Sequence, residues 1–133
     1  MPDELILLET TRWLRYARED LDAAIALKPT TPRHSCLLAQ QCAEKAIKSI
    51  YVFLDLRVPR SHDLDMLKNL LPDEWNIKAR FNDLSELSVW AVESRYPGDM
   101  PEATKEDADA ATNMAKDILC CVDSDLRKKG FNL

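Results

Sequence analysis

Three short stretches of the sequence carry polar side chains that could bind a ligand. In a loop, Arg60 precedes His62, where a neutral imidazole could bind a base or phosphate beside the guanidinium. Further on, the guanidinium and ring of Arg95-Tyr96 suit the phosphate and base of a nucleotide. The third stretch is the polar side of a helix expected over residues 33–54. The candidate ligand-binding residues are Gln41, Lys45, Lys48, Arg60, His62, Asp63, Arg95 and Tyr96.

Each stretch also has a purely structural interpretation. Asp63 can cap the first turn of a helix while the neighbouring imidazole merely packs. Arg95 can pair with a carboxylate while Tyr96 closes one end of a bundle. Lysines 45 and 48 with Glu44 are ordinary on a solvated helix surface, where residues three and four apart form ion pairs. The sequence leaves these alternatives open.

Two glutamines of the helix over residues 33–54 indicate more than a solvated surface. Gln40 and Gln41 lie beside an apolar stripe whose members recur at steps of three and four. If these amides are buried, they need hydrogen-bond partners. A dimer interface or a ligand would provide such partners.

The helix over residues 33–54 is the element around which the others must pack, because its ends are apolar nearly all round. Further helices are expected from residue 9 or 10 to 27 and over 62–71, 74–95 and 104–129, with residues 1–8 as an N-terminal extension. Thr31 and Ser61 are the expected caps of two helices, and the last helix has a capping box at Thr104 and a stop at Gly130. The sequence therefore predicts an all-α fold, an up-down antiparallel four-helix bundle with one extra short helix.

Composition agrees with one helical domain spanning residues 1–133, with its core at about 9–129. The chain has 133 residues, only two glycines and a net charge of −5. An excess of acid disfavours a broad DNA-binding surface. The sequence shows no signal peptide and no apolar run of 18 residues, so we expect a cytoplasmic protein without membrane contact.

Several kinds of reactive site are excluded by spacing. Neither His34 nor His62 has a Glu three residues before it, so the di-iron motif of helical bundles is missing. The sequence contains no Gly-rich phosphate loop, serine nucleophile elbow or zinc motif. The four cysteines do not converge in pairs on a helix, which predicts buried core thiols. We expect no metal and no cofactor.

Four segments together resemble the HEPN domain family. They are WLRYAREDLD at 13–22, LAQQCAEKAIK at 38–48, SHDLDML at 61–67 and SRYP at 94–97, and the resemblance extends over residues 13–126. It implies a five-helix fold built on an up-down bundle. It also implies a homodimer encoded beside a minimal nucleotidyltransferase, with nucleotide or RNA binding. Some members of the family are toxins that cut RNA.

The ribonucleases of that family carry an Arg-x4-6-His motif near the end of the fourth helix, and this sequence departs from it. Arg95 stands at that place, but no His lies four to six residues beyond it. The string from Arg57 to His62 has the spacing, yet it lies in a different loop that Pro59 keeps from being helical. The weak catalytic candidates are therefore Arg95, His62 and Arg57.

Three functions remain as hypotheses. The preferred one is a dimeric module that binds a nucleotide or RNA end as the partner of a separately encoded minimal nucleotidyltransferase in a toxin-antitoxin-like system. The second is a metal-independent ribonuclease toxin with a degenerate Arg-x4-6-His site. The third is a purely structural protein-protein interaction module.

Overall fold

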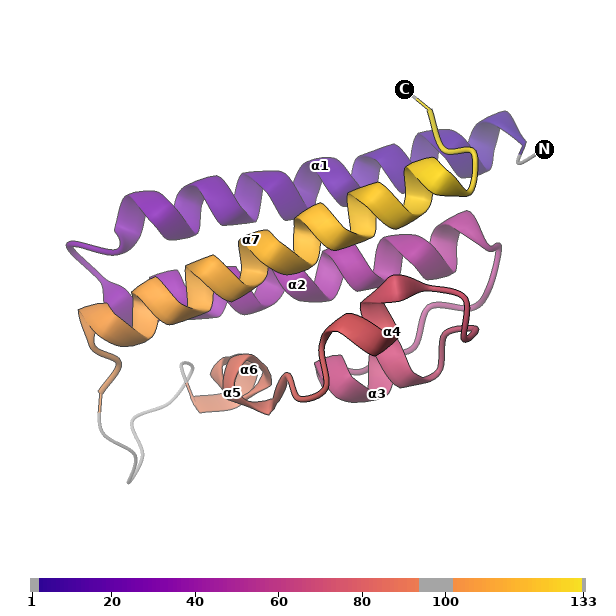
Figure 1. Cartoon of the computed structure of the whole chain (residues 1–133). Coiled ribbons are helices and arrows are strands. Elements are labelled where there is room, and N and C mark those ends of the chain that lie inside the picture. The colour runs from indigo at the N-terminus through magenta and orange to yellow at the C-terminus, as the bar shows by residue number, and fades with distance from the viewer. Residues whose placement is uncertain (1–2, 94–101, 133) are drawn as a thin grey trace.

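The computed structural model describes residues 3–93 and 102–132, and these residues form helices and no strand. Three long helices, α1 (Glu4–Leu27), α2 (Pro32–Phe53) and α7 (Lys105–Lys128), lie side by side (Figure 1). The described residues between α2 and α7 include several short helices, which lie on the side of α2 opposite α1 (Figure 1). The expected all-α helical bundle is confirmed. The short helices are α3 (Leu64–Asn69), α4 (Asn76–Arg80), α5 (Ser85–Ser88) and α6 (Trp90–Glu93).

The central position of α2 agrees with its apolar pattern. It contacts α1, α7, α3, α5 and α6, and Ile47 and Ile50 are fully buried among them. Pro32 stands in the first turn, where its missing N–H costs nothing. Thr31 holds the N-cap position, but its side chain makes no capping hydrogen bond. The helix ends at Phe53, one residue before the end of the range expected from the sequence.

Helix α1 begins at Glu4, so the expected extension over residues 1–8 is wrong for residues 4–8. The Asp3 carboxylate accepts a hydrogen bond from the backbone N–H of Ile6 at 3.0 Å and thereby caps the helix. Leu7 packs against the buried core. An Asp cap followed by Glu in the first turn is a helix-start signal, and it lies before the expected start at residue 9 or 10.

The single helix expected over residues 74–95 is also wrong, because the described part of this segment forms α4, α5 and α6. The backbone at Phe81 is extended, with φ −119° and ψ 107°. Asp83 accepts from the N–H of Ser85 at 2.9 Å, and the N–H of Leu84 donates to the Asp65 carboxylate at 2.9 Å. Acidic side chains that bind the backbone in this way compete with helical hydrogen bonds.

Helix α3 is shorter than expected and has a different cap. The Asp63 side chain accepts from the N–H groups of Asp65 and Met66, whereas Ser61, the expected cap, accepts from the N–H of Asp63 at 3.1 Å. The structural interpretation of Asp63 as a helix cap is therefore correct. Tyr51 of α2 donates its hydroxyl to the carbonyl oxygen of Leu67 at 2.6 Å and ties α3 to α2.

Both ends of α7 follow the sequence signals. Thr104 and Asp107 exchange the two hydrogen bonds of a capping box. At the other end Gly130 has φ +99°, a conformation that favours glycine, and Phe131 donates its N–H to the carbonyl oxygen of Leu126 at 3.0 Å. The capping box and the glycine stop are confirmed.

The cysteines are free in this fold, and three of the four are buried. Burial raises the pKa of the Cys36 and Cys42 thiols to about 12, so these groups stay protonated. Cys120 is exposed on α7, so the expectation of a buried thiol is wrong there. Across 3–93 and 102–132, side chains form no cluster able to hold a metal ion. None of the helices in these ranges combines the length and apolar character needed to cross a membrane.

Candidate functional site

Three polar residues of α2 form a buried row. Gln40, Glu44 and Lys48 are spaced four apart, so they share one face of the helix. All three side chains are buried. Two of them, Glu44 and Lys48, are charged, and charged side chains are buried only when they are paired. The alternative interpretation of this stretch as a solvated helix surface is therefore wrong for Glu44 and Lys48. We call this row together with His62 the polar cluster.

Glu44 is the centre of the polar cluster. Its Oε2 accepts from Lys48 Nζ at 2.9 Å, while Oε1 accepts from Gln40 Nε2 at 3.1 Å and contacts Nδ1 of His62 at 2.7 Å. Burial alone would raise the pKa of Glu44, but the hydrogen bonds from Lys48, Gln40 and His62 outweigh it and lower that pKa below its ordinary value. Glu44 is therefore a carboxylate at neutral pH.

His62 joins the cluster from the loop between α2 and α3. Its backbone carbonyl accepts from Gln40 Nε2 at 3.3 Å, so α2 holds both the main chain and the side chain of this residue. Because a carboxylate only accepts, Nδ1 carries the hydrogen in the contact with Glu44. In the neutral ring, Nε2 then keeps a free lone pair. The imidazole is 53% exposed and can present this nitrogen to a ligand.

A cavity of about 410 Å³ opens beside His62. Its polar groups are mostly acceptors and hydroxyls, and two of them are fixed by the fold. Ser88 Oγ accepts from the N–H of Leu64 at 3.0 Å, and Asp65 accepts from Leu84 and pairs with Lys68. The lining residues are His62, Asp63, Asp65, Ser85, Ser88, Val89, Ala91 and Val92.

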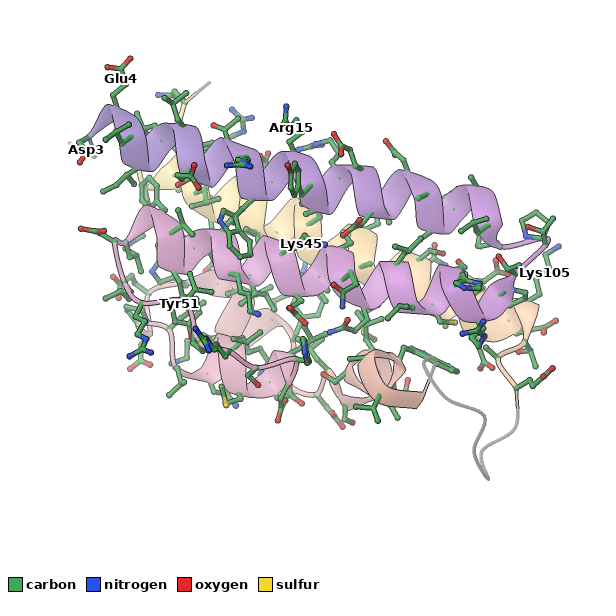
Figure 2. The ribbon with its side chains drawn as sticks, turned by 180° about the vertical axis from the view of Figure 1, so that it is seen from behind. Asp3, Glu4, Arg15, Lys45, Tyr51 and Lys105 are labelled. Carbon is green, nitrogen blue, oxygen red and sulfur yellow. The ribbon has the colours of Figure 1, made fainter. Side chains whose placement is uncertain are left out.

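Lys45 is turned away from the polar cluster. It lies between α1 and α2 (Figure 2), and its Nζ pairs with the Asp20 carboxylate of α1 at 2.5 Å. One residue corresponds to about 100° around a helix, which is enough to separate Lys45 from Glu44. The structure therefore does not bring together Lys45 and His62, which are both candidate ligand-binding residues.

The other predicted residues divide between the cluster and its surroundings. Gln41 Nε2 donates to Gln40 Oε1 at 2.8 Å, so the buried amides of α2 find partners within the chain. Asp63 caps α3 and lines the cavity. Arg57 and Arg60 are exposed in the loop that leads to His62. Of the candidate residues, the structure thus brings Gln41, Lys48, His62 and Asp63 to one region.

Arg95 and Tyr96 lie outside the described residues, so their predicted place at the site stays a prediction. The candidate ligand-binding residues named from the sequence did not include Gln40, Glu44 and Ser88. Gln40 and Glu44 could have been found from the sequence, because polar residues at steps of four next to an apolar stripe share one helix face. Ser88 had no such signal, since it reaches the cavity only through the break of the expected helix over 74–95.

Comparisons with known proteins agree on the kind of domain. The model of the HEPN domain matches residues 10–126. The crystal structure of TT1696 from Thermus thermophilus has a TM-score of 0.76 and 24% identity, covering 87% of this chain and 97% of that one. The crystal structure of ST0689, an archaeal HEPN homologue, has a TM-score of 0.68 and 30% identity, covering 86% and 95%. No curated protein shows significant similarity to the chain.

Proposed function

The chain belongs to the HEPN domain family, and from this premise we propose that it is a homodimeric module that binds a nucleotide or the end of an RNA. Its partner is a separately encoded minimal nucleotidyltransferase, and the pair works as a cytoplasmic toxin-antitoxin-like system. The observation that supports ligand binding is the half-exposed imidazole of His62, held by a buried carboxylate at the edge of a cavity.

The chemistry of this cavity suits the sugar and base of a nucleotide. Nε2 of His62 can accept a hydrogen bond from a ribose hydroxyl or a base N–H, and the carboxylates of Asp63 and Asp65 can accept others. The volume of about 410 Å³ lies in the range of small-molecule sites. Phosphate needs cations, and Arg57 and Arg60 offer them from the exposed loop next to His62.

Exposed apolar side chains support the association with other chains. Leu5 and Leu8 of α1 are 73% and 56% exposed, and Val92 at the cavity is 62% exposed. Single exposed apolar residues are common, but Leu5 and Leu8 are three apart and share one side of α1. A second copy and the nucleotidyltransferase are the proposed occupants of these surfaces.

Titration calorimetry with ATP, GTP and a short RNA tests the proposal. Binding should weaken at least tenfold in His62→Ala, because the variant removes the exposed acceptor at the cavity. His34→Ala is the matched control, since His34 is an exposed histidine at the start of α2 that does not line the cavity. No binding at millimolar ligand, by the protein alone or with its nucleotidyltransferase, would contradict the proposal.

A second candidate, the ribonuclease toxin, is favoured by the contact between His62 and Glu44. A carboxylate that orients a histidine through Nδ1 leaves Nε2 ready to take a proton, as general base catalysis requires. If His62 has this role, the wild type and His34→Ala should both cleave a labelled RNA in the presence of a metal chelator. Equal cleavage by His62→Ala, or none by any of the three, removes His62 from catalysis.

A further inference from the structure

A second cavity, of about 330 Å³, lies between α7 and the segment formed by α5 and α6. Its volume is in the range of small-molecule sites. Of the described residues that line it, Val89 alone also lines the cavity beside His62, and the proposed function does not use it. We call it the α5–α7 pocket. The lining residues that matter for its chemistry are Glu86, Leu87, Trp90, Asp107, Ala111 and Met114.

The walls of the α5–α7 pocket are largely apolar. Leu87 and Trp90 line it from α5 and α6. On α7, Asp107, Ala111 and Met114 follow one another at steps of four and three, so they share the helix face that lines the pocket. The side chains of Trp90 and Met114 are partly buried. An aromatic ring and a flexible thioether can cover an alkyl chain, and the face of an indole ring also attracts cations.

The charged groups of the pocket are carboxylates on opposite walls, Glu86 on α5 and Asp107 on α7. Within residues 3–93 and 102–132, no lysine, arginine or histidine lines the pocket, and none pairs with Glu86. Asp107 Oδ2 accepts from the N–H of Thr104 at 2.8 Å in the capping box. This hydrogen bond fixes the carboxylate and leaves Oδ1 for another donor.

We propose that the α5–α7 pocket binds an aliphatic diamine. One ammonium group binds Glu86 and the other binds Asp107, while the alkyl chain between them covers Trp90 and Met114. An anion is repelled by both carboxylates, and an uncharged apolar ligand would take water from them without replacing its hydrogen bonds. A monoamine would satisfy only one carboxylate. A diamine has a cation at each end for charge-assisted hydrogen bonds and an apolar middle for the walls.

Titration of the whole chain with cadaverine, pentylamine and pentanol tests the proposal, because these probes share one alkyl chain and differ in charge. Physiological salt screens the general attraction of an acidic protein for cations. The indole N–H signals in the proton–nitrogen NMR spectrum report on the site, since the signal lost in Trp90→Phe identifies Trp90. Cadaverine should shift this signal and bind about tenfold more tightly than pentylamine, and pentanol should bind more weakly still.

Three acid-to-amide variants provide the matched comparison. Glu86→Gln and Asp107→Asn should each weaken cadaverine binding about tenfold and abolish its preference over pentylamine, because one carboxylate is then left. The Asn oxygen can still accept from Thr104, so Asp107→Asn keeps the capping hydrogen bond. Glu106→Gln removes the same charge from the first turn of α7 but does not line the pocket, so it should leave binding within about twofold.

Three results would overturn the proposal. They are a Trp90 signal that does not move at millimolar cadaverine, equal affinity for cadaverine and pentylamine, and equal losses in Glu86→Gln and Glu106→Gln. His62→Ala separates this site from the proposed function, because it keeps every lining residue of the pocket and should bind cadaverine as the wild type does. Failure of cadaverine binding in a protein that still binds nucleotide would overturn this proposal alone.

Discussion

Two lysines of α2, three residues apart, form ion pairs in very different surroundings. Lys48 pairs with Glu44 where the two side chains are 9% and 8% exposed, whereas Lys45 pairs with Asp20 where they are 25% and 20% exposed. The first pair is supported by Gln40 and His62, and the second joins α1 to α2 within reach of water. Similar residues on one helix therefore have different energetic importance, because burial decides what an unpaired charge costs.

The largest expected effect comes from removing the buried carboxylate. Glu44→Gln should lower the free energy of unfolding by about 3 kcal/mol, because Lys48 is left as a buried cation without an opposite charge. Urea denaturation measures this change. Asp20→Asn, which removes the carboxylate of the Lys45 pair, is the comparison. If Glu44→Gln costs no more than Asp20→Asn, the two pairs are energetically equivalent, contrary to the difference in burial.

A double variant sharpens the same comparison. Glu44→Gln with Lys48→Met should recover part of the loss of Glu44→Gln, because no uncompensated charge then remains buried. Asp20→Asn with Lys45→Met should be additive to within about 0.5 kcal/mol, as expected for a pair near water. Additivity in the Glu44 pair would contradict the coupling that its geometry indicates.

The pH dependence of stability should report on Glu44 alone when wild type and Glu44→Gln are compared. The pKa of Glu44 in the folded protein lies below its ordinary value of 4.5. A carboxyl with a lowered folded-state pKa adds stability above the unfolded-state pKa and loses it as the pH falls through the folded-state pKa. The difference between the two proteins should shrink as the pH falls below about 4.5. A difference that grows on acidification would contradict this direction.

Loss of the His62 imidazole should have an intermediate effect. His62→Ala removes one hydrogen bond to Glu44, but Lys48 and Gln40 still hold the carboxylate. The side chain is half exposed, so we expect a loss of about 1 kcal/mol in unfolding free energy, measured by urea denaturation. His34→Ala should cost less, and a loss of more than about 3 kcal/mol in His62→Ala would make His62 mainly structural.

The smallest effect is expected at the Lys45 pair. Asp20→Asn should lower the unfolding free energy by about 0.5 kcal/mol at low salt, and the difference should fade in about 1 M NaCl because salt screens accessible charges. Thermal melts at both salt concentrations measure this. If the loss does not change with salt, the pair of Lys45 and Asp20 is shielded from solvent like the pair of Lys48 and Glu44.

The helices that the sequence predicted well carry their signals locally. The capping box at Thr104 and the stop at Gly130 bound α7, and the apolar pattern identifies α2 as the central helix. The expected helix over 74–95 failed because its breaks depend partly on distant groups. The N–H of Leu84 is bound by Asp65, nineteen residues earlier, and no local pattern shows that contact.

The residues of the candidate site show the same difference between what local sequence predicts and what distant contacts decide. Residue types drew attention to His62 and Lys48, and the structure joins both to Glu44. Lys45 was a candidate ligand-binding residue as well, but its position around the helix directs it to α1. Arg95 and Tyr96 fall outside the described residues, and their part in a site stays a prediction.

The sequence by itself determined that the chain is helical, that α2 is its centre and that the chain resembles HEPN domains, because periodicity, caps and motifs are properties of neighbouring residues. The tertiary structure alone decided which charges are buried. Glu44 and Lys45 are adjacent in the chain, yet Glu44 is enclosed beside Lys48, whereas Lys45 meets Asp20 near solvent. Burial depends on the elements that pack against each face of a helix, and these elements come from distant parts of the chain.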